Sequence, residues 1–570
     1  MSNHNEISSF IWNVCDDVLR GLFKQHEYGD VILPFVVLRR LDCVLEGKKD
    51  EIIKVHREYK DKFDDTSKII HSKLNLKFSN YSEYDLRRLK NEPNKLSDNF
   101  YDYLSSFSTN VQDIIQNFGL QKHIDKLESN NKLYILVEKF TDIDLHPSNL
   151  DNHVMGNIFE ELLRKFSEMS NETSGEHYTP RDVVKLLVSL VFSPDRDKLS
   201  NPNKIISVYD PCCGTGGMLT IGKDWVHENI NKEVDINLFG QELNPQTYSI
   251  CKSDFLITDE EPDNIKLGST LTNDQHSDGN RKFDYMITNP PFGVSWKSEQ
   301  KQILNESSEY GGRFSVGTPR SSDGSLLFLQ HLISKMETQG SRIGIVFNGS
   351  PLFTGDSGSG ESEIRKWIIE NDWLEGIVSL PTKLFFNTGI STYLWIVSNN
   401  KKTKRKGKIQ LINGSNYGTS MRKNLGEKSN YITDEDSQKI IQTYQNFEEN
   451  EYSKIFDNEY FGYTKITIEQ PKVENGQVVR DKKGNPKPDS KLRDYERIPL
   501  SKDIEEYFSE EVEPHLPNSW IDFDKNKKGY EINFNKYFYQ YKSLRSSDEI
   551  TQDLLELKKE SENLLNLIMD

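Results

Sequence analysis

The sequence predicts an α/β protein in which a helical domain is followed by a mainly parallel sheet with helices on both faces, and then by a mostly helical extension. Two observations predict the sheet. Between about residues 175 and 400, short runs rich in Ile and Val alternate with helical stretches, which is typical of βαβ units. Two of these runs end in motifs rich in glycine or proline, and such sheets bind ligands beyond the carboxyl ends of their strands.

Residues 1–165 are predicted to form the helical domain. Phe10, Val14, Val18 and Leu22 recur at every fourth position, which places them on one face of a helix. A polar stretch with scattered aromatic residues follows and fits amphipathic helices joined by loops. Because no catalytic pattern is found here, we expect a docking or substrate-covering role.

Residues 166–415 are predicted to form the domain that contains the sheet. Its expected strands are five or six residues long and are flanked by Gly, Pro or Asn. They are residues 205–209, 236–241, 283–288, 342–347, 376–380 and 393–398.

Residues 416–570 are predicted to form the C-terminal extension, which ends in an amphipathic helix. Apolar residues recur there at alternating four- and three-residue steps, at Ile550, Leu554, Leu557, Leu564 and Ile568. This heptad pattern suits packing on a helix of a partner, and an ordinary helix folded on its own domain is the alternative.

Charge and composition limit the classes of function. The chain has 570 residues and a net charge of −17, whereas an independent DNA-binding protein is usually basic because phosphate contacts supply much of its affinity. No apolar run of about 18 residues predicts a membrane span. The five cysteines form no CxxC pair, which argues against a zinc site or a disulfide framework and indicates a reducing cytosol. No metal is expected.

The first functional motif is the segment DPCCGTGG, which follows the strand expected at residues 205–209. Its glycines allow a tight turn and a close approach of the backbone to a ligand, and the helix that opens at Met218 favours electron-rich groups at its N-terminus. The spacing differs from the dinucleotide fingerprint GxGxxG. The candidate binding residues are Asp210, Gly214, Thr215, Gly216 and Gly217.

An acidic residue, Glu242, closes the next expected strand. A carboxylate at this position can accept hydrogen bonds from both ribose hydroxyls of a nucleoside. A carboxylate at the end of a strand often has no such role, but its place one βα unit after the glycine-rich loop favours ligand binding.

The most specific motif is Asn289-Pro290-Pro291-Phe292, at the end of the strand expected at residues 283–288. Two consecutive prolines fix the backbone and remove two donors, so that carbonyls face outward as acceptors. The Asn289 side-chain oxygen and the Pro290 carbonyl can then accept both hydrogens of an exocyclic amine, and Phe292 can stack on a planar base. A structural turn explains the prolines but not the flanking Asn and Phe, so these four are the candidate catalytic residues.

With these motifs the sequence resembles the class I amino-methyltransferases, which have a Rossmann-like fold and use S-adenosylmethionine. The segment GEHYTPR resembles the segment that closes over the methionine part of this cofactor. The resemblance implies cofactor contacts at Glu176, His177, Tyr178, Thr179, Pro180 and Arg181. Ser269 falls where relatives often have an acidic residue near the adenine of the cofactor, which gives it a similar expected role.

The order of the motifs is that of the γ group of DNA amino-methyltransferases, and most of the chain resembles the modification subunit of type I restriction–modification systems. The resemblance extends to residues 22–41, 153–166, 492–500 and 529–539. It implies a cytoplasmic enzyme that methylates adenine N6 in double-stranded DNA. It also implies two partners, a specificity subunit that reads the target and a motor–nuclease subunit, with two copies of the chain per complex. Such partners would explain how an acidic chain acts on DNA.

The motifs also bear on the target base. The chain lacks the Pro-Cys-Gln loop of cytosine-C5 enzymes, and Asn in place of Ser at position 289 favours adenine over cytosine N4. Residues 296–324 are polar and rich in Gly and Ser, which predicts a mobile loop over the target base with Arg313 and Arg320 as candidate phosphate contacts. A surface loop without a role in DNA binding explains these residues equally well.

Three other functions stay open. An RNA or protein-glutamine N-methyltransferase can use nearly the same tetrapeptide, although those enzymes are usually shorter. A catalytically silent assembly subunit is a second possibility, which the intact motifs argue against. In the third, the chain is self-sufficient: residues 400–570 read the target and the basic cluster at 401–408 contacts phosphate. A solvated turn explains that cluster equally well.

Overall fold

The computed structural model describes residues 2–170, 179–201, 203–258, 260–291, 293–386, 388–539 and 546–569. The chain divides into two compact units, Met1–Ile532 and Asn533–Asp570. The domain boundaries predicted near residues 165 and 415 both fall inside the first unit and stay predictions. No helix in these ranges is both long enough and apolar enough to cross a membrane.

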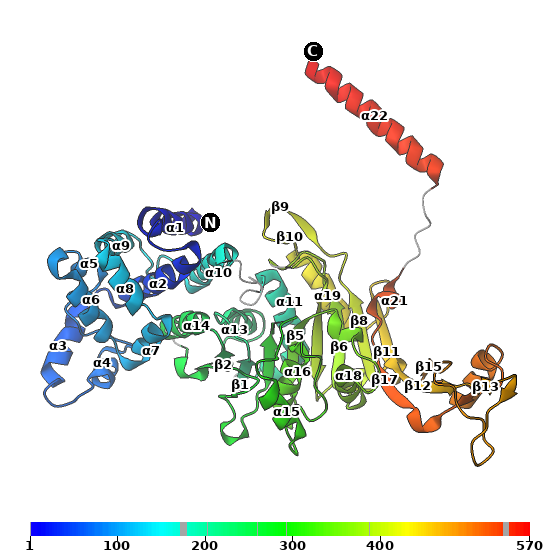
Figure 1. Ribbon diagram of the computed structural model, residues 1–570. Helices are drawn as coiled ribbons and strands as arrows, with labels where there is room; N and C mark the ends of the chain where they lie inside the picture. The colour runs from blue at the N-terminus through cyan, green and yellow to red at the C-terminus, as the bar shows by residue number, and fades with distance from the viewer. Residues whose placement is uncertain are drawn as a thin grey trace. The chain divides into compact units, whose positions relative to one another are not determined.

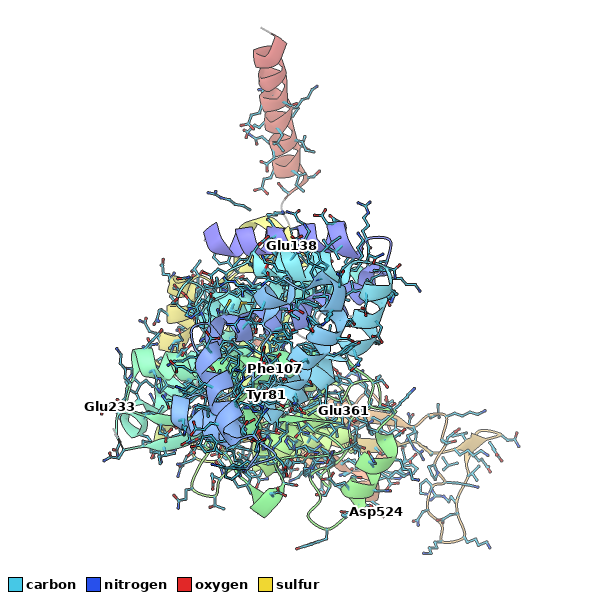
Figure 2. The ribbon with its side chains drawn as sticks, turned by 90° about the vertical axis from the view of Figure 1, so that its left-hand side faces the viewer. Tyr81, Phe107, Glu138, Glu233, Glu361 and Asp524 are labelled. Atoms are coloured by element: carbon cyan, nitrogen blue, oxygen red, sulfur yellow. The ribbon has the colours of Figure 1, made fainter. Side chains whose placement is uncertain are left out.

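The N-terminal part of the first unit is helical, as predicted (Figure 1). Helix α2 is buried along nearly its whole length, and the side chains of Arg39 and Arg40 donate to the carbonyls of Ile143 and Leu150, both at 2.8 Å. The helices enclose a core that contains Phe107 (Figure 2) and that extends to Ile250 and Leu256 of the later helix α14 (Pro245–Ile257). They are α1 (Ser2–Val14), α2 (Tyr28–Leu45), α3 (Lys49–Tyr59), α4 (Ser67–Leu74), α5 (Leu86–Leu89), α6 (Leu96–Ser105), α7 (Thr109–Phe118), α8 (Gln121–Ser129), α9 (Leu133–Thr141) and α10 (Asn152–Ser170).

Within the described residues, nine strands form the central sheet in the order β11-β8-β6-β7-β5-β4-β1-β2-β3. The six strands predicted from the sequence are all present, as β1, β2, β4, β5, β6 and β7. The other three lie in short or polar segments that carry no clear strand pattern. The bounds are β1 (Ile205–Asp210), β2 (Asp235–Glu242), β3 (Ile265–Leu267), β4 (Tyr285–Thr288), β5 (Arg342–Asn348), β6 (Leu374–Ser379), β7 (Thr392–Ser398), β8 (Lys408–Asn413) and β11 (Ser453–Asp457).

The sheet is mixed but mainly parallel. Strands β3, β2, β1, β4 and β5 pair in parallel, as do β6 and β8. Strand β7 runs antiparallel to both of its neighbours, β5 and β6, and β11 runs antiparallel to β8. The motifs that follow β1 and β4 therefore leave the sheet at the same edge, because these two strands are parallel neighbours.

Helices cover the sheet so that its central strands are buried on both faces. On β5, a Cβ at Gly344 would lie 2.5 Å from a methyl group of Val191 on α11, which allows this helix to approach closely. Ile343 and Ile345, whose side chains point to the opposite face, are also fully buried. The helices of this part of the chain are α11 (Arg181–Phe192), α12 (Arg196–Leu199), α13 (Gly217–Asn229), α14 (Pro245–Ile257), α15 (Gln300–Ser308), α16 (Ser325–Ser334), α17 (Ser350–Phe353), α18 (Gly360–Glu370) and α19 (Asp434–Asn446).

The prediction of a mostly helical extension is wrong for residues 416–532. A hairpin of β9 (Thr419–Leu425) and β10 (Lys428–Tyr431) precedes α19, and β11 completes the central sheet. A second sheet pairs β12 (Gly462–Glu469) with β15 (Asp494–Pro499), β16 (Trp520–Ile521) and β17 (Lys527–Tyr530), and β13 (Val473–Glu474) pairs with β14 (Gln477–Val478). Helix α20 (Ile504–Tyr507) follows β15. The segment GYTKITIE is rich in β-branched and aromatic residues, which favour strands.

The second unit contains α21 (Phe534–Phe538) and α22 (Ser547–Met569), so the predicted terminal helix is present. Ile550, Leu554 and Leu557 are 46%, 62% and 61% exposed. The side chains of Leu564 and Ile568 lie outside the described residues. The described part of the predicted heptad stripe is thus an exposed apolar face.

A buried ionic cluster joins β5, β6 and α19. The guanidinium of Arg342 donates two hydrogen bonds of 3.1 Å to the carboxylate of Glu375, which also accepts from the Tyr444 hydroxyl at 2.5 Å. Arg405 lies 3.4 Å from the same carboxylate. Burial alone would raise the pKa of Glu375, but the charges of Arg342 and Arg405 hold this pKa at about 2.

We expect Glu375→Gln to lower the free energy of unfolding by about 3–5 kcal/mol, because it leaves two buried guanidinium groups without a countercharge. Urea unfolding at pH 7 measures this change. The matched control is Glu363→Gln, which breaks a half-exposed pair with Lys366 and should change stability by about 0.5 kcal/mol or less. Equal effects of the two substitutions would contradict the assigned role of the cluster.

Candidate active site

The glycine-rich loop joins the end of β1 to the start of α13. Gly214 and Gly216 have φ of 54° and 85°, which L side chains rarely adopt. A Cβ on Gly216 would also lie 2.8 Å from the Sγ atom of Cys251. Position 216 therefore requires glycine for both its backbone conformation and its lack of space. The turn brings the N-terminus of α13 to the carboxyl edge of the sheet.

Asn289 follows β4 and is tied to the segment before α11. Its Nδ2 atom donates to the hydroxyl of Thr179 at 2.9 Å, which fixes the amide with its Oδ1 atom as the remaining acceptor. This Oδ1 atom is buried and has no hydrogen-bond partner among the described residues. Buried polar atoms are nearly always paired, so this acceptor is suited to a ligand that brings its own donor.

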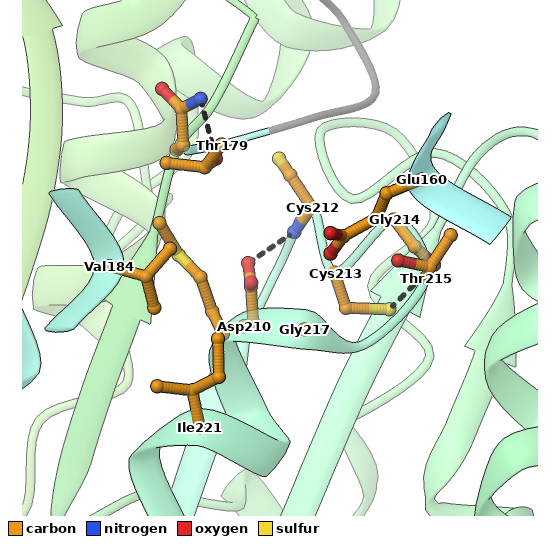
Figure 3. A pocket seen from close by; sticks show the side chains of 12 residues that line it. Glu160, Thr179, Val184, Asp210, Cys212, Cys213, Gly214, Thr215, Gly217 and Ile221 are labelled. Carbon is orange, nitrogen blue, oxygen red and sulfur yellow. Dashed lines mark hydrogen bonds between the residues drawn. The ribbon is translucent and has the colours of Figure 1, made fainter. Parts of the chain in front are cut away.

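These elements enclose one pocket, in which the predicted residues Thr179, Asp210, Gly214, Thr215, Gly217 and Asn289 come together. Figure 3 shows Thr179 and Asp210 from different elements facing the same space. The other residues of the lining, to which the sequence motifs assign no role, are Glu160, Val184, Cys212, Cys213, Met218 and Ile221. Most of these are ordinary apolar residues of a helix or loop, and no local pattern distinguishes them.

Asp210 is a fully buried carboxyl group. Burial raises its pKa to about 7, although hydrogen bonds from the Thr288 hydroxyl at 2.6 Å and the Cys212 amide at 2.9 Å act in the opposite direction. Asp210 therefore changes its charge near neutral pH, at the centre of the pocket lining.

Glu242 lies beside the glycine-rich loop, at the end of β2. Its Oε2 atom accepts from the Gly214 amide at 2.8 Å, and its Oε1 atom accepts from the Asn244 amide at 2.7 Å. It is 9% exposed and is not part of the pocket lining. In this structure its carboxylate orders the loop, and its predicted contact with a ribose stays a prediction.

The other predicted residues surround the pocket without lining it. Pro180 is the N-cap of α11, Arg181 pairs with Glu160 at 3.4 Å, and the hydroxyl of Ser269 donates to the carboxylate of Glu299. Pro290 is buried and Pro291 is half-buried. Four predicted site residues, Glu176, His177, Tyr178 and Phe292, lie outside the described residues.

The structure corrects the role expected for Arg313. Its side chain is 15% exposed, donates to the carbonyls of Thr270 and Leu271 at 2.8 Å, and pairs with Glu306. A guanidinium so fully engaged inside the protein is not available to a phosphate. Arg320 is half exposed, and its phosphate contact stays a prediction.

The basic cluster at residues 401–408 forms the turn between β7 and β8. Lys401 is buried and pairs with Asp372 at 2.6 Å, and Arg405 is buried beside Glu375. These two cations stabilise the fold, whereas Lys402, Lys404 and Lys406 are exposed, and a phosphate contact by the cluster stays a prediction.

The mainly parallel sheet and the pocket at its carboxyl edge agree with the predicted class I methyltransferase fold. A family model described as N-6 DNA Methylase matches residues 150–469, and one described as HsdM N-terminal domain matches residues 7–140. The chain belongs to the N-6 DNA methylase family. The predicted family and its reaction class, adenine-specific methylation of DNA, are thereby confirmed.

Individual relatives agree with this assignment. The chain is 28% identical over 494 residues to the type I restriction enzyme MjaIX methylase subunit of Methanocaldococcus jannaschii, covering 83% of each chain. It is 23% identical to the type I restriction enzyme EcoKI methylase subunit of Escherichia coli, covering 68% of this chain and 66% of that one. Among solved structures, a type I restriction-modification methyltransferase subunit from Streptococcus thermophilus has the same fold, with a TM-score of 0.62, 22% identity and coverage of 80% of this chain and 97% of that one.

We expect Asp210→Asn to remove a pH dependence of stability. The folded carboxyl group binds its proton more tightly than the unfolded one, whose pKa is near 3.8, so the wild type loses stability as pH rises from about 4 to about 7. Asparagine does not titrate. The free energy of unfolding of the variant, relative to that of the wild type, should therefore rise by on the order of 2–4 kcal/mol between pH 5 and pH 8, since one pKa unit corresponds to about 1.4 kcal/mol. Urea unfolding at both pH values measures the gain, and a difference independent of pH would contradict it.

Proposed function

We propose that this chain transfers the methyl group of S-adenosylmethionine to N6 of an adenine flipped out of double-stranded DNA, as the modification subunit of a type I restriction–modification complex. The observation that carries the proposal is the buried Oδ1 atom of Asn289, which has no hydrogen-bond partner among the described residues and lies in a pocket beside the glycine-rich loop. A primary amine presented there would satisfy this acceptor.

The residues around the pocket fit the cofactor. The N-terminus of α13 and the positive-φ glycines leave the backbone open to a close ligand, and the charged residues that line the pocket are acidic. Bound S-adenosylmethionine supplies an electrophilic methyl group on a positively charged sulfur. The residues proposed to hold this cofactor are Glu176, His177, Tyr178, Thr179, Pro180, Arg181, Asp210, Gly214, Thr215, Gly216, Gly217, Glu242 and Ser269.

In the proposed mechanism, Asn289 and Pro290 position the adenine. The Asn289 Oδ1 atom and the Pro290 carbonyl accept the two hydrogens of N6, which directs the nitrogen lone pair toward the methyl group. Thr179 holds the Asn289 amide at 2.9 Å, so the acceptor is oriented before the base arrives. Alignment of the reacting atoms supplies most of the rate enhancement. Pro291 stiffens the loop, and Phe292 is proposed to stack on the flipped base.

The partners are part of the proposal. A chain with a net charge of −17 lacks the overall positive charge of an independent DNA-binding protein. We propose that a specificity subunit supplies target recognition, that a motor–nuclease subunit carries out cleavage, and that two copies of this chain act per complex. The methylase-subunit relatives support this assignment.

We expect Asn289→Ala to lower the rate of methyl transfer by about 100- to 1,000-fold, because it removes an oriented electrostatic contact with the reacting amine. Affinity for S-adenosylhomocysteine should change little. The measurement is transfer of labelled methyl groups to genomic DNA that lacks the modification, with the specificity subunit present. Asn446→Ala, an exposed substitution at the end of α19, is the control and should retain full activity.

The same assay distinguishes the alternatives when it is run with and without the specificity subunit. Label in N6-methyladenine only with the partner supports a modification subunit. Transfer by the chain alone indicates that it reads its own target. No transfer in either case, with the cofactor bound, points to an RNA or protein substrate and contradicts the proposal.

We expect the exposed apolar stripe of α22 to be required for assembly. Leu554→Asp combined with Leu557→Asp places charges on this stripe and should abolish co-purification with the specificity subunit, while binding of S-adenosylhomocysteine is unchanged. Glu556→Gln combined with Lys559→Gln alters other exposed positions of the same helix and is the control. Intact assembly in the first variant would show that the stripe is not the docking face.

A further inference from the structure

Helix α10 packs on the N-terminal helices and lies within the residues matched by the N-6 DNA methylase model, and one of its side chains lines the candidate cofactor pocket. Glu160 is 7% exposed and lines the same pocket as Thr179, Asp210 and the glycine-rich loop. Figure 3 shows Glu160 extending over this loop near Gly214 and Thr215. The sequence motifs assign no role to this residue.

The position of the Glu160 carboxylate is fixed from two sides. Its Oε2 atom lies 3.4 Å from the Nε atom of Arg181, and its Oε1 atom lies 3.1 Å from the position that a Cβ on Gly217 would take. One turn earlier on α10, a Cβ on Gly156 would lie 3.1 Å from an Nη atom of Arg181. Glycines at 156 and 217 thus let the helix, the arginine and the N-terminus of α13 come close together.

The charged side chains of the described pocket lining, Glu160 and Asp210, are both acidic. Arg181, which pairs with Glu160, lines the adjoining cavity and not this pocket. An ammonium group is a strong partner for a buried carboxylate, because hydrogen bonds between charged groups are about twice as strong as neutral ones. The amino-acid part of S-adenosylmethionine carries such an ammonium group.

We propose that Glu160 binds the α-ammonium group of the cofactor, so that α10 completes the cofactor site. This inference rests on the proposed function only in the identity of the cofactor. It assigns α10 a direct part in cofactor affinity.

The test compares two ligands that differ in the proposed contact. S-adenosylhomocysteine contains the ammonium group, whereas 5′-methylthioadenosine lacks the whole amino-acid part. We expect Glu160→Gln to weaken binding of S-adenosylhomocysteine by about 10- to 100-fold, the range of a hydrogen bond to a charged group. Binding of 5′-methylthioadenosine should change less than about twofold. Isothermal titration calorimetry on the full chain measures both affinities.

Two further variants separate ligand binding from folding. Glu161→Gln makes the same chemical change at the next residue, which pairs with Lys165 on α10, and should leave both affinities unchanged. Glu160→Asp retains the charge and should recover part of the affinity for S-adenosylhomocysteine. If Glu160→Gln does not fold, Glu160→Asp must still weaken S-adenosylhomocysteine selectively.

Other results would overturn the inference. Equal weakening of both ligands by Glu160→Gln would show that Glu160 only holds α10 against the catalytic domain. Unchanged binding of both ligands would show that it has no part in the site. If the wild type binds neither ligand, the proposed function itself fails, which is distinguishable from either result.

Discussion

The parallel pairing of β1 with β4 is the constraint on which the site depends. Its register sets Val208 opposite Tyr285 and Tyr209 opposite Met286, so the residues that follow the two strands meet at one edge of the sheet. Thr288 is the last residue of β4, and its hydroxyl donates to the carboxyl group of Asp210, the last residue of β1. The glycine-rich loop and the Asn-Pro-Pro-Phe segment are separated by about 70 residues of sequence, yet this pairing makes them two sides of one pocket.

The polar groups at this edge are held in states that are costly without a ligand. In the part of the chain that the structure describes, the buried Asn289 Oδ1 atom has no partner, which costs roughly 1–3 kcal/mol. Burial of Asp210 also raises its pKa to about 7 and so penalises its charge. The stability of the sheet, which is buried on both faces and contains the Arg342–Glu375 cluster, offsets both of these unfavourable free energies. A rigid framework of this kind can keep acceptors oriented before a substrate arrives.

Acidic and basic side chains have different places and roles in the molecule. The pocket lining contains acidic side chains, which suits a cationic cofactor and not a DNA backbone. Arg313, Lys401 and Arg405 are engaged inside the fold. These three cations therefore serve the structure, which agrees with the proposal that partners help the chain to bind the duplex.

The sequence by itself determined the six main strands, the N-terminal helices, the glycine-rich loop and the Asn-Pro-Pro-Phe segment. These depend on periodicity and on residues close together in the chain. Only the tertiary structure decided the reversed direction of β7, the strands after residue 416, the burial of Arg313 and the arrival of Glu160 at the pocket. A strand has the same pattern in either direction. A side chain's role depends on which distant segment packs against it, and packing of distant segments leaves no local pattern.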